Sequence, residues 1–426
     1  MVNRITLTLV FTLSFLTYLT SELSVSLQLV PVVLFAALVF FRVVWSHQIL
    51  RAVGSLLELD GLLFVIFLSS LIVGPSIESK FDKSLEFAFL ISACLILGRL
   101  YMAVVPISEV LEAFFWSGII SIGIFVSLSF ASLLQSMVTL ERFFAFGFHP
   151  NLLAFVLAAY FCVMVWKFMT GDWRVKVLTG LLASLCLVII FLASSRGSIV
   201  GIIAGSLFIA GIATVRAKRE RRIMFLRLSF LAAALLLGVV IFVAHFRWTK
   251  DVYEYVDQVL QLSQDYRGLD TGFTGRWDKW VAVIRTFDDG TFLLGRGIRS
   301  SDFTEMSIDN GYLVILYELG LIQLVLIAWR FFYILRTFLK GYFGAITIMR
   351  RHFYLCWILV LVVFLVNNIV ARFLFAVGNP YSLLAFLLFA TPTSSLLEGH
   401  LLPCEAGPGL LRQPANLSEL NVQPLS

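Results

Sequence analysis

Arginines stand at the ends of several apolar segments of this chain, and anion binding is the chemistry that suits them. A guanidinium group stays charged and donates paired hydrogen bonds to phosphate. Each arginine taken alone is also compatible with a side chain that reaches lipid headgroups. An arginine without a partner inside a membrane costs a few kcal/mol, which a bound anion would offset. Arg142, Arg196 and Arg372 at segment ends predict a site for a polyphosphate or another anion, and Arg276 and Arg296 of the long polar loop are expected to join them.

Two carboxylates accompany these arginines where a long polar loop meets an apolar segment. Asp309 lies in Ser-Ile-Asp-Asn-Gly-Tyr, directly before the segment 312–330, and Glu318 follows about two helical turns later. An aspartate before a helix accepts hydrogen bonds from its free amide groups, so Asp309 is a candidate N-cap, which does not exclude catalysis. Glu318 is costly within a span unless it faces a polar cavity or an arginine.

Compact polar turns lie beside the other arginines. His149-Pro150-Asn151 opens the segment 151–169, and Ser194-Ser195-Arg196-Gly197 forms the whole of a later turn. Pro-Asn and Ser-Arg-Gly are ordinary turn sequences. His149 is either an interfacial or capping residue or a group that binds an acceptor.

The elements that must position these residues are membrane-spanning helices. Of the 426 residues 60% are hydrophobic and only 14% are charged, and the mean hydropathy is +0.95. Apolar runs this long without alternation exclude a β-barrel, so we expect an all-α polytopic membrane protein with about twelve transmembrane helices. The third and the last are short, which leaves eleven possible. The runs are 5–20, 27–45, 61–75, 86–103, 113–133, 151–169, 176–193, 198–215, 226–244, 312–330, 353–370 and 375–391.

Lys and Arg are concentrated in alternate short loops, which orients the chain because positive charge resists translocation. Both termini are expected in the cytoplasm, and most of the net charge of +6 follows from this orientation. The basic run 216–222 lies between two spans, so we expect it to contact anionic lipid rather than nucleic acid.

Four regions follow from this pattern. The long outer loop is expected to contain amphipathic helices, one of which starts near Gly275-Arg276-Trp277 and stops at Asp288-Asp289-Gly290. None of the five cysteines lies in that loop, so no disulfide framework and no cysteine metal site are expected. The regions are 1–245 with nine spans, 246–311 as the outer loop, 312–391 with three spans, and 392–426 as a disordered cytoplasmic tail.

Several short motifs occur in a fixed order between residues 142 and 375. They are Arg142 with Pro150-Asn151, Ser195-Arg196-Gly197, Gly275-Arg276-Trp277, Gly295-Arg296-Gly297, and Asp309-Asn310-Gly311-Tyr312-Leu313 followed by Glu318-Leu319-Gly320. In this order they resemble the O-antigen ligase and polysaccharide polymerase superfamily of bacterial inner-membrane glycosyltransferases.

The resemblance implies the C-type glycosyltransferase fold and a metal-independent enzyme that needs no cofactor. Its substrate would be undecaprenyl-pyrophosphate-linked glycan at the periplasmic face, and a protein that regulates chain length would be a further partner. Asp309 would accept a proton with Arg276 as the second catalytic residue. The residues expected to bind pyrophosphate or substrate are Arg142, Arg196, Arg296, Arg372, His149, Asn151, Asn310, Tyr312 and Glu318.

Three functions remain open on this evidence. Ligases of the superfamily usually carry histidine before the Asn-x-Tyr-Leu segment, whereas this chain carries Asp309. That departure favours a polymerase of repeat units over a ligase that transfers finished glycan to lipid A core or another acceptor. A flippase or transporter of lipid-linked oligosaccharide is the non-enzymatic alternative, but no internal repeat is evident and the polar groups gather on one face.

Overall fold

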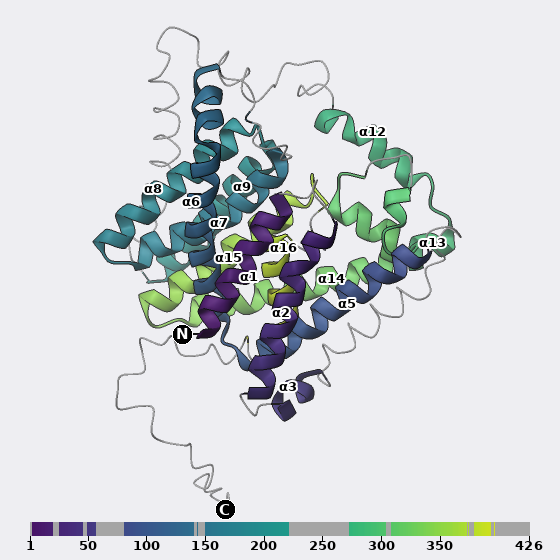
Figure 1. Ribbon diagram of the computed structural model, residues 1–426, viewed down its shortest axis with the longest axis horizontal. Helices are drawn as coiled ribbons and strands as arrows, with labels where there is room; N and C mark the ends of the chain where they lie inside the picture. Colours follow the sequence, from purple (N-terminus) through teal and green to yellow (C-terminus); the bar gives the residue numbers. More distant parts are fainter. Residues whose placement is uncertain are drawn as a thin grey trace, which may run out of the picture.

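In the computed structural model every regular element of the described residues is a helix (Figure 1). The structure describes residues 2–19, 25–45, 49–56, 81–139, 143, 150–220, 272–303, 308–372, 374, 379–392 and 396. The α-helices are α1 (Val2–Leu19), α2 (Val25–Trp45), α3 (Ile49–Leu56), α5 (Phe81–Val104), α6 (Ile107–Thr139), α7 (Pro150–Thr170), α8 (Trp173–Leu192), α9 (Arg196–Glu220), α12 (Gly272–Ile284), α13 (Asp289–Leu294), α14 (Gly311–Gly344), α15 (Ile348–Asn367) and α16 (Pro380–Ala390). A short 3-10 helix, η2 (Ser300–Phe303), follows α13.

Seven of the described helices are long and apolar enough to cross a membrane, namely α5, α6, α7, α8, α9, α14 and α15. The apolar parts of α1, α2 and α16 are shorter, as the sequence indicated for the last of them. The expected third and ninth spans, 61–75 and 226–244, lie outside the described residues. The helical membrane architecture is confirmed, and the count of twelve stays a prediction.

Polar contacts bring the first residues of α9 and α14 to the last residues of α15. The amide of Gly311 donates to the carbonyls of Asn368 at 2.8 Å and Ala371 at 2.9 Å. The hydroxyl of Ser198 donates to the Asn367 side chain at 3.1 Å. We call this end of the bundle the site face.

Small residues allow α9 and α15 to approach closely below these contacts. A Cβ atom on Gly201 would lie 2.8 Å from Nδ2 of Asn367, and one on Gly205 would lie 2.8 Å from Cδ1 of Leu359. Glycines four residues apart share one face of a helix, so their missing side chains form a groove that receives α15.

Away from the site face, buried arginines bind the carbonyl groups that helix C-termini leave free. Arg330 donates to the carbonyls of Phe389 at 3.0 Å and of Thr391, at the end of α16. Arg216 donates to the carbonyl of Ala345 at 3.0 Å, beyond the end of α14. The expectation that the basic run 216–222 contacts lipid is therefore wrong for Arg216, which is buried in protein.

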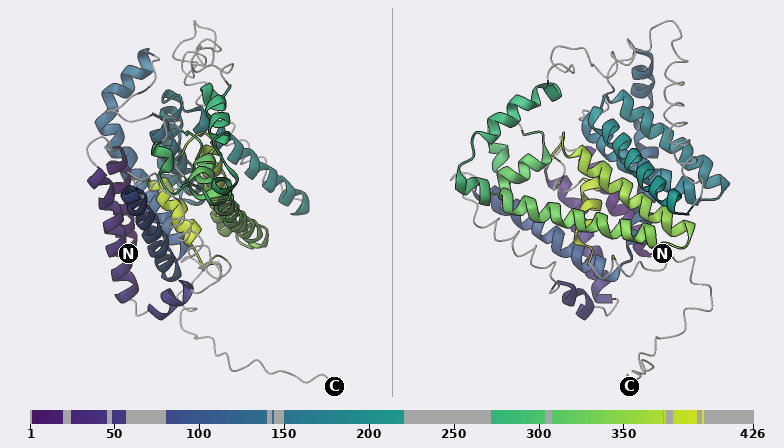
Figure 2. Two further views of the ribbon diagram at one scale, coloured as in Figure 1. Left: turned by 90° about the vertical axis from the view of Figure 1, so that its right-hand side faces the viewer. Right: turned by 180° about the vertical axis from the view of Figure 1, so that it is seen from behind.

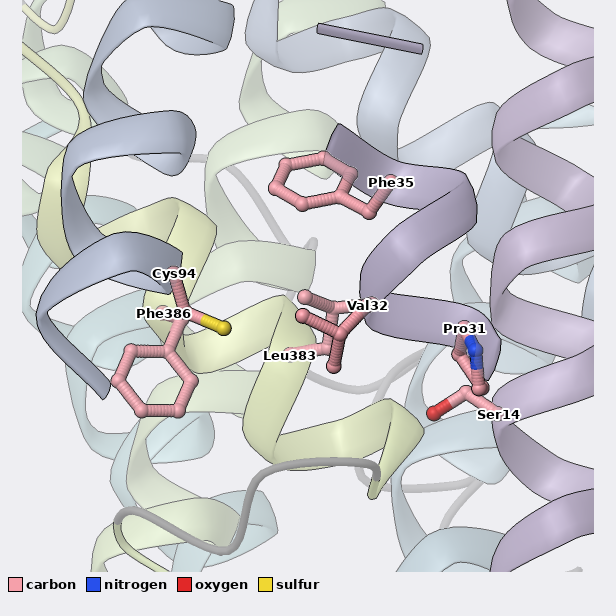
Figure 3. A pocket seen from close by; sticks show the side chains of 7 residues that line it. All are labelled: Ser14, Pro31, Val32, Phe35, Cys94, Leu383 and Phe386. Atoms are coloured by element: carbon pink, nitrogen blue, oxygen red, sulfur yellow. The ribbon is translucent and has the colours of Figure 1, made fainter. Parts of the chain in front are cut away.

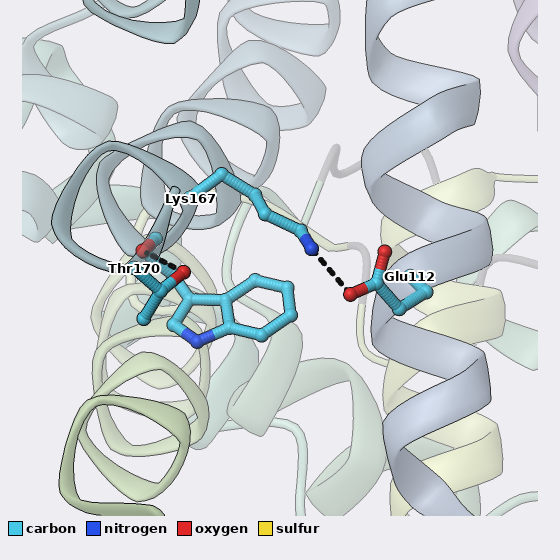
Figure 4. Close-up of polar contacts among 4 residues, drawn as sticks. Glu112, Lys167 and Thr170 are labelled. Carbon is cyan, nitrogen blue, oxygen red and sulfur yellow. Dashed lines mark hydrogen bonds and ion pairs between the residues drawn. The ribbon is translucent and has the colours of Figure 1, made fainter. Parts of the chain in front are cut away.

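The ion pair between Lys167 and Glu112 joins α7 to α6 (Figure 4). The ammonium group also lies 4.4 Å from the ring centroid of Trp166. A small apolar pocket between α1, α2, α5 and α16 has Ser14 and Cys94 in its wall (Figure 3). Its other lining residues are apolar, so it offers no anion site.

Helix α14 is broken at Gly320, where φ is 81° and ψ is 173°. Its 34 residues would extend about 51 Å, whereas the 20 residues of α15 extend about 30 Å. Both helices nevertheless meet at both ends, because Arg351 of α15 donates to the carbonyl of Ala345 at 3.1 Å. The segment 311–319, here called the α14 arm, must therefore run across the direction of the remaining helix. Figures 1 and 2 show α12 and α13 beside it at one edge of the bundle.

Candidate active site

Asp309 and Arg276, the two residues expected to be catalytic, form an ion pair. The Oδ2 atom of Asp309 lies 3.6 Å from Nε of Arg276, and the side chains are 39% and 21% exposed. A half-exposed pair at this distance is weak, because water screens the charges. Both groups can therefore be reached by a ligand.

The helix cap at the start of α14 is Asn310. Its Oδ1 atom accepts hydrogen bonds from the amides of Tyr312 at 2.9 Å and Leu313 at 3.0 Å. The capping role expected for Asp309 is therefore wrong, since the next residue satisfies these amide groups. Asn310 positions the helix and leaves the carboxylate of Asp309 directed to Arg276.

Two neighbours of Asn310 fix the α14 arm to the end of α15. A Cβ atom on Gly311 would lie 2.9 Å from Oδ1 of Asn368 and 3.0 Å from the carbonyl oxygen of Ala371, so a side chain would push the two segments apart. The hydroxyl of Tyr312 donates to the carbonyl of Leu365 at 2.7 Å. Tyr312 therefore positions the arm, and its contact with substrate stays a prediction.

Arg196 and Arg372 lie next to the contacts that define the site face. Arg196 is the first residue of α9, two residues before Ser198, and Arg372 directly follows Ala371. Asn151 lies half-buried in the first turn of α7. Arg142 and His149 fall outside the described residues. The structure thus brings the starts of α9 and α14 and the turn after α15 together, while a common anion site for these arginines stays a prediction.

The turn Gly295-Arg296-Gly297 packs against the break in α14. The amides of Arg296 and Gly297 donate to the carbonyls of Tyr317 at 3.0 Å and Glu318 at 2.9 Å. These are carbonyls that the break removes from the helical hydrogen-bond pattern. Gly295 also has a φ of 81°, and a Cβ atom there would lie 2.4 Å from the carbonyl oxygen of Glu318. Only glycine suits such a conformation at such a distance.

The guanidinium group of Arg296 joins the end of α12 to the α14 arm. It donates to the carbonyl of Thr286 and to the hydroxyl of Tyr317 at 3.4 Å, and it lies 5.1 Å from the centroid of the Tyr317 ring. A role in binding pyrophosphate stays a prediction for Arg296. Its contacts in the structure instead hold α12, and with it Arg276, against the arm that carries Asp309.

Glu318 is almost fully buried, and the hydroxyl of Ser301 donates to its Oε1 atom. This contact ties η2 to the α14 arm. A buried carboxylate needs hydrogen bonds, and for this reason the sequence predicted that Glu318 faces a polar cavity or an arginine. Contact between Glu318 and substrate stays a prediction.

The amphipathic helix expected from residue 275 exists as α12, but its apolar side chains divide between two surroundings. Trp280, Val283 and Phe287 pack with Ile308, Leu313 and Tyr317, whereas Trp277 is 56% exposed. The expected helix stop at 288–290 is wrong, because α12 already ends at Ile284. Asp288 is instead the N-cap of α13, and its side chain accepts from the amide of Thr291 at 2.8 Å in a capping box.

The cap also affects the ionisation of Asp288. The amide of Thr291 is the main cause that lowers the pKa of Asp288 below the usual range for aspartate. In the part of the chain that the structure describes, no three His, Cys, Asp or Glu side chains are grouped so that they could hold a metal ion. Independence from metal stays a prediction.

Residues 181–328 match a family model described as O-Antigen ligase. The matched range contains α9, α12, α13, the α14 arm, and the Arg276–Asp309 pair. No curated protein matches the chain in a sequence comparison. The resemblance drawn from the motifs is thereby confirmed.

Proposed function

We propose that the chain is a glycan polymerase, because residues 181–328 match a family model described as O-Antigen ligase. It joins undecaprenyl-pyrophosphate-linked oligosaccharide repeat units into O-antigen or exopolysaccharide at the periplasmic face of a bacterial inner membrane. The observation that carries the proposal is the partly exposed ion pair between Asp309 and Arg276 at the start of α14.

In this reaction a hydroxyl oxygen of the acceptor glycan attacks C1 of the donor sugar. The bond between C1 and the pyrophosphate oxygen breaks, and undecaprenyl pyrophosphate leaves with the bonding electrons. The acceptor hydroxyl loses its proton to the carboxylate of Asp309. A positioned base of this kind contributes about 10²- to 10⁴-fold in rate.

Arg276 has two tasks in this scheme. Its guanidinium group orients the Asp309 carboxylate in the resting protein, and it neutralises negative charge on the leaving pyrophosphate during the reaction. Arg196 and Arg372, at the same end of the bundle, supply further positive charge for the two phosphates. Arg142, Arg296, His149 and Asn151 are proposed as further contacts to the substrate.

A ligase that transfers glycan to lipid A core or another acceptor is the second candidate. The carboxylate at residue 309, where ligases usually carry histidine, favours the polymerase. Carboxylate and imidazole differ in basicity at neutral pH, so the position affects the acceptor hydroxyl directly. A lipid-linked oligosaccharide transporter is the alternative that needs no base.

To test this proposal, purified protein in lipid nanodiscs is given a synthetic undecaprenyl-pyrophosphate repeat unit, and the length of the lipid-linked products is measured. Lengthening without another acceptor supports the polymerase. Glycan transfer only after addition of lipid A core identifies a ligase, and the absence of any transfer in both reactions contradicts an enzyme.

Three variants probe the proposed pyrophosphate contacts in the same assay. Arg196→Ala, Arg276→Ala and Arg372→Ala are each expected to abolish lengthening while the protein level is unchanged. Arg174→Ala is the matched control, because Arg174 is an exposed arginine at the opposite end of the bundle, at the start of α8. Normal products from all three variants would exclude the pyrophosphate site.

A further inference from the structure

The α12–α13 segment exposes large apolar side chains although it lies outside the spans. Leu293 in α13 is 46% exposed, and Phe292, Leu294 and, on α12, Ile284 are exposed as well. Exposed apolar groups gathered in this way need a partner surface other than water.

The exposed residues of α12 fall into separate sectors. The exposed Trp277 and Ile284 and the partly buried Val281 share one side of the helix by their spacing, next to the side on which Val283 packs against the α14 arm. The exposed charged residues Asp278 and Lys279 occupy the remaining side. One side thus contacts protein, one side is exposed and apolar, and one side is charged. A helix at a membrane surface has this combination of exposed faces.

The apolar surface of α13 continues onto a spanning helix. Leu293 lies at the break of α14, because a Cβ atom on Gly320 would be 2.2 Å from its carbonyl oxygen. Directly after the break, Ile322, Val325 and Trp329 are exposed, and Trp329 reaches 62%. Residues at this spacing share one face of α14. A spanning helix exposes such a face to lipid, so the neighbouring leucines of α13 adjoin the lipid-facing surface.

A contact with α5 indicates the depth of the α12–α13 segment along the membrane normal. The guanidinium group of Arg299, five residues after α13, lies 4.1 Å from the centroid of the Phe87 ring. In the sequence, a charged stretch that ends at Glu86 precedes the apolar run of α5. The loop that follows α13 therefore lies where a span enters the apolar layer, and not above the membrane.

We propose that α12 and α13 form a membrane-surface element in which Phe292, Leu293 and Leu294 lie among the acyl chains of the outer leaflet. The exposed carboxylates Asp288 and Asp289, at the start of α13, lie at the headgroups. The bilayer thereby sets the height of Arg276 and Asp309 above the apolar layer. This consequence rests on the proposed function, since a lipid-linked pyrophosphate would meet the pair at that height.

A spin label distinguishes lipid from the other possible coverings. Leu293→Cys is labelled with a nitroxide in a Cys404→Ser background, because the four cysteines that the structure describes are buried. The protein is placed at one copy per lipid nanodisc, and collisions with oxygen and with a water-soluble nickel chelate are measured. Val325→Cys is the control for lipid, and Asp289→Cys is the control for water.

The oxygen-to-nickel collision ratio at Leu293 should equal that at Val325 and exceed that at Asp289 several-fold. A ratio at Leu293 equal to that at Asp289 would show exposure to water and overturn the proposal. Protection of Leu293 from both reagents would indicate covering by protein and would overturn it as well. The measurement needs no substrate, so its failure is distinguishable from failure of the proposed polymerase activity.

Discussion

Gly320→Ala should disable the enzyme from a position outside the ion pair. Gly320 adopts a φ of 81° and a ψ of 173°, a region that residues other than glycine hardly occupy. Alanine also favours continuous helix, so the substitution should straighten α14 at the break. The α14 arm would then move away from the Gly295 turn and carry Asp309 away from Arg276.

The structure sets the size of this effect. The backbone strain amounts to about 1–3 kcal/mol. A Cβ atom on residue 320 would also lie 2.2 Å from the carbonyl oxygen of Leu293, which is backbone and cannot rotate away. The arm must therefore shift. A displacement of about 1 Å in a reacting group lowers the rate about 10²-fold, so we expect a loss of at least that order.

The assay measures lengthening of the undecaprenyl-pyrophosphate repeat unit by purified variants in nanodiscs. Gly344→Ala is the matched control, because a Cβ atom at this position of the same helix would meet no heavy atom within 4 Å. Gly295→Ala should reproduce the defect of Gly320→Ala. The double variant should be less impaired than the product of the two single losses, because both changes disrupt one contact.

Equal rates for Gly320→Ala and Gly344→Ala would refute this reasoning. It would mean that the break in α14 does not set the position of Asp309. Retention of the helical circular-dichroism spectrum by Gly320→Ala would show that a lost rate reflects the moved arm and not unfolding.

Three further predictions concern the stability of the helix bundle and of α13. Gly201→Ala should lower the melting temperature by several degrees relative to Gly211→Ala, since only the first Cβ atom would meet α15, and equal values would contradict the close packing. Arg330→Met should cost about 3 kcal/mol, because it leaves two buried carbonyls without donors, and an unchanged unfolding midpoint would contradict this. Because the pKa of Asp288 is lowered in the folded protein, its cap stabilises α13 above the ordinary aspartate pKa and is lost as pH falls through the lowered value. The protection factors of the α13 amides against hydrogen exchange should fall over that range, and Asp288→Asn should remove this pH dependence.

The sequence was sufficient to predict features that depend on local composition. Apolar runs predict helices because lipid forces the backbone to satisfy its own hydrogen bonds. The helix at Arg276 and the start of α14 followed from periodicity and turn residues. The sequence could not decide whether Asp309 or Asn310 caps α14, because both side chains cap helices well and only the backbone conformation distinguishes them.

Other features depend on contacts between distant segments. A glycine within an apolar span is common, so Gly320 carries no signal of a break until it is seen against Gly295. Arg216 belongs to a basic run of the kind that contacts lipid, and its burial depends on the loop between α14 and α15. The capping box of Asp288 with Thr291 was legible in the sequence and would have predicted α13.

The most direct test of the account compares Asp309→Asn with Asp309→Glu in single-turnover lengthening of the lipid-linked repeat unit. If the carboxylate accepts the acceptor proton beside Arg276, asparagine should lower the rate by about 10²- to 10⁴-fold while glutamate keeps most of it. Asparagine that sustains the rate of the unaltered protein would contradict the central claim.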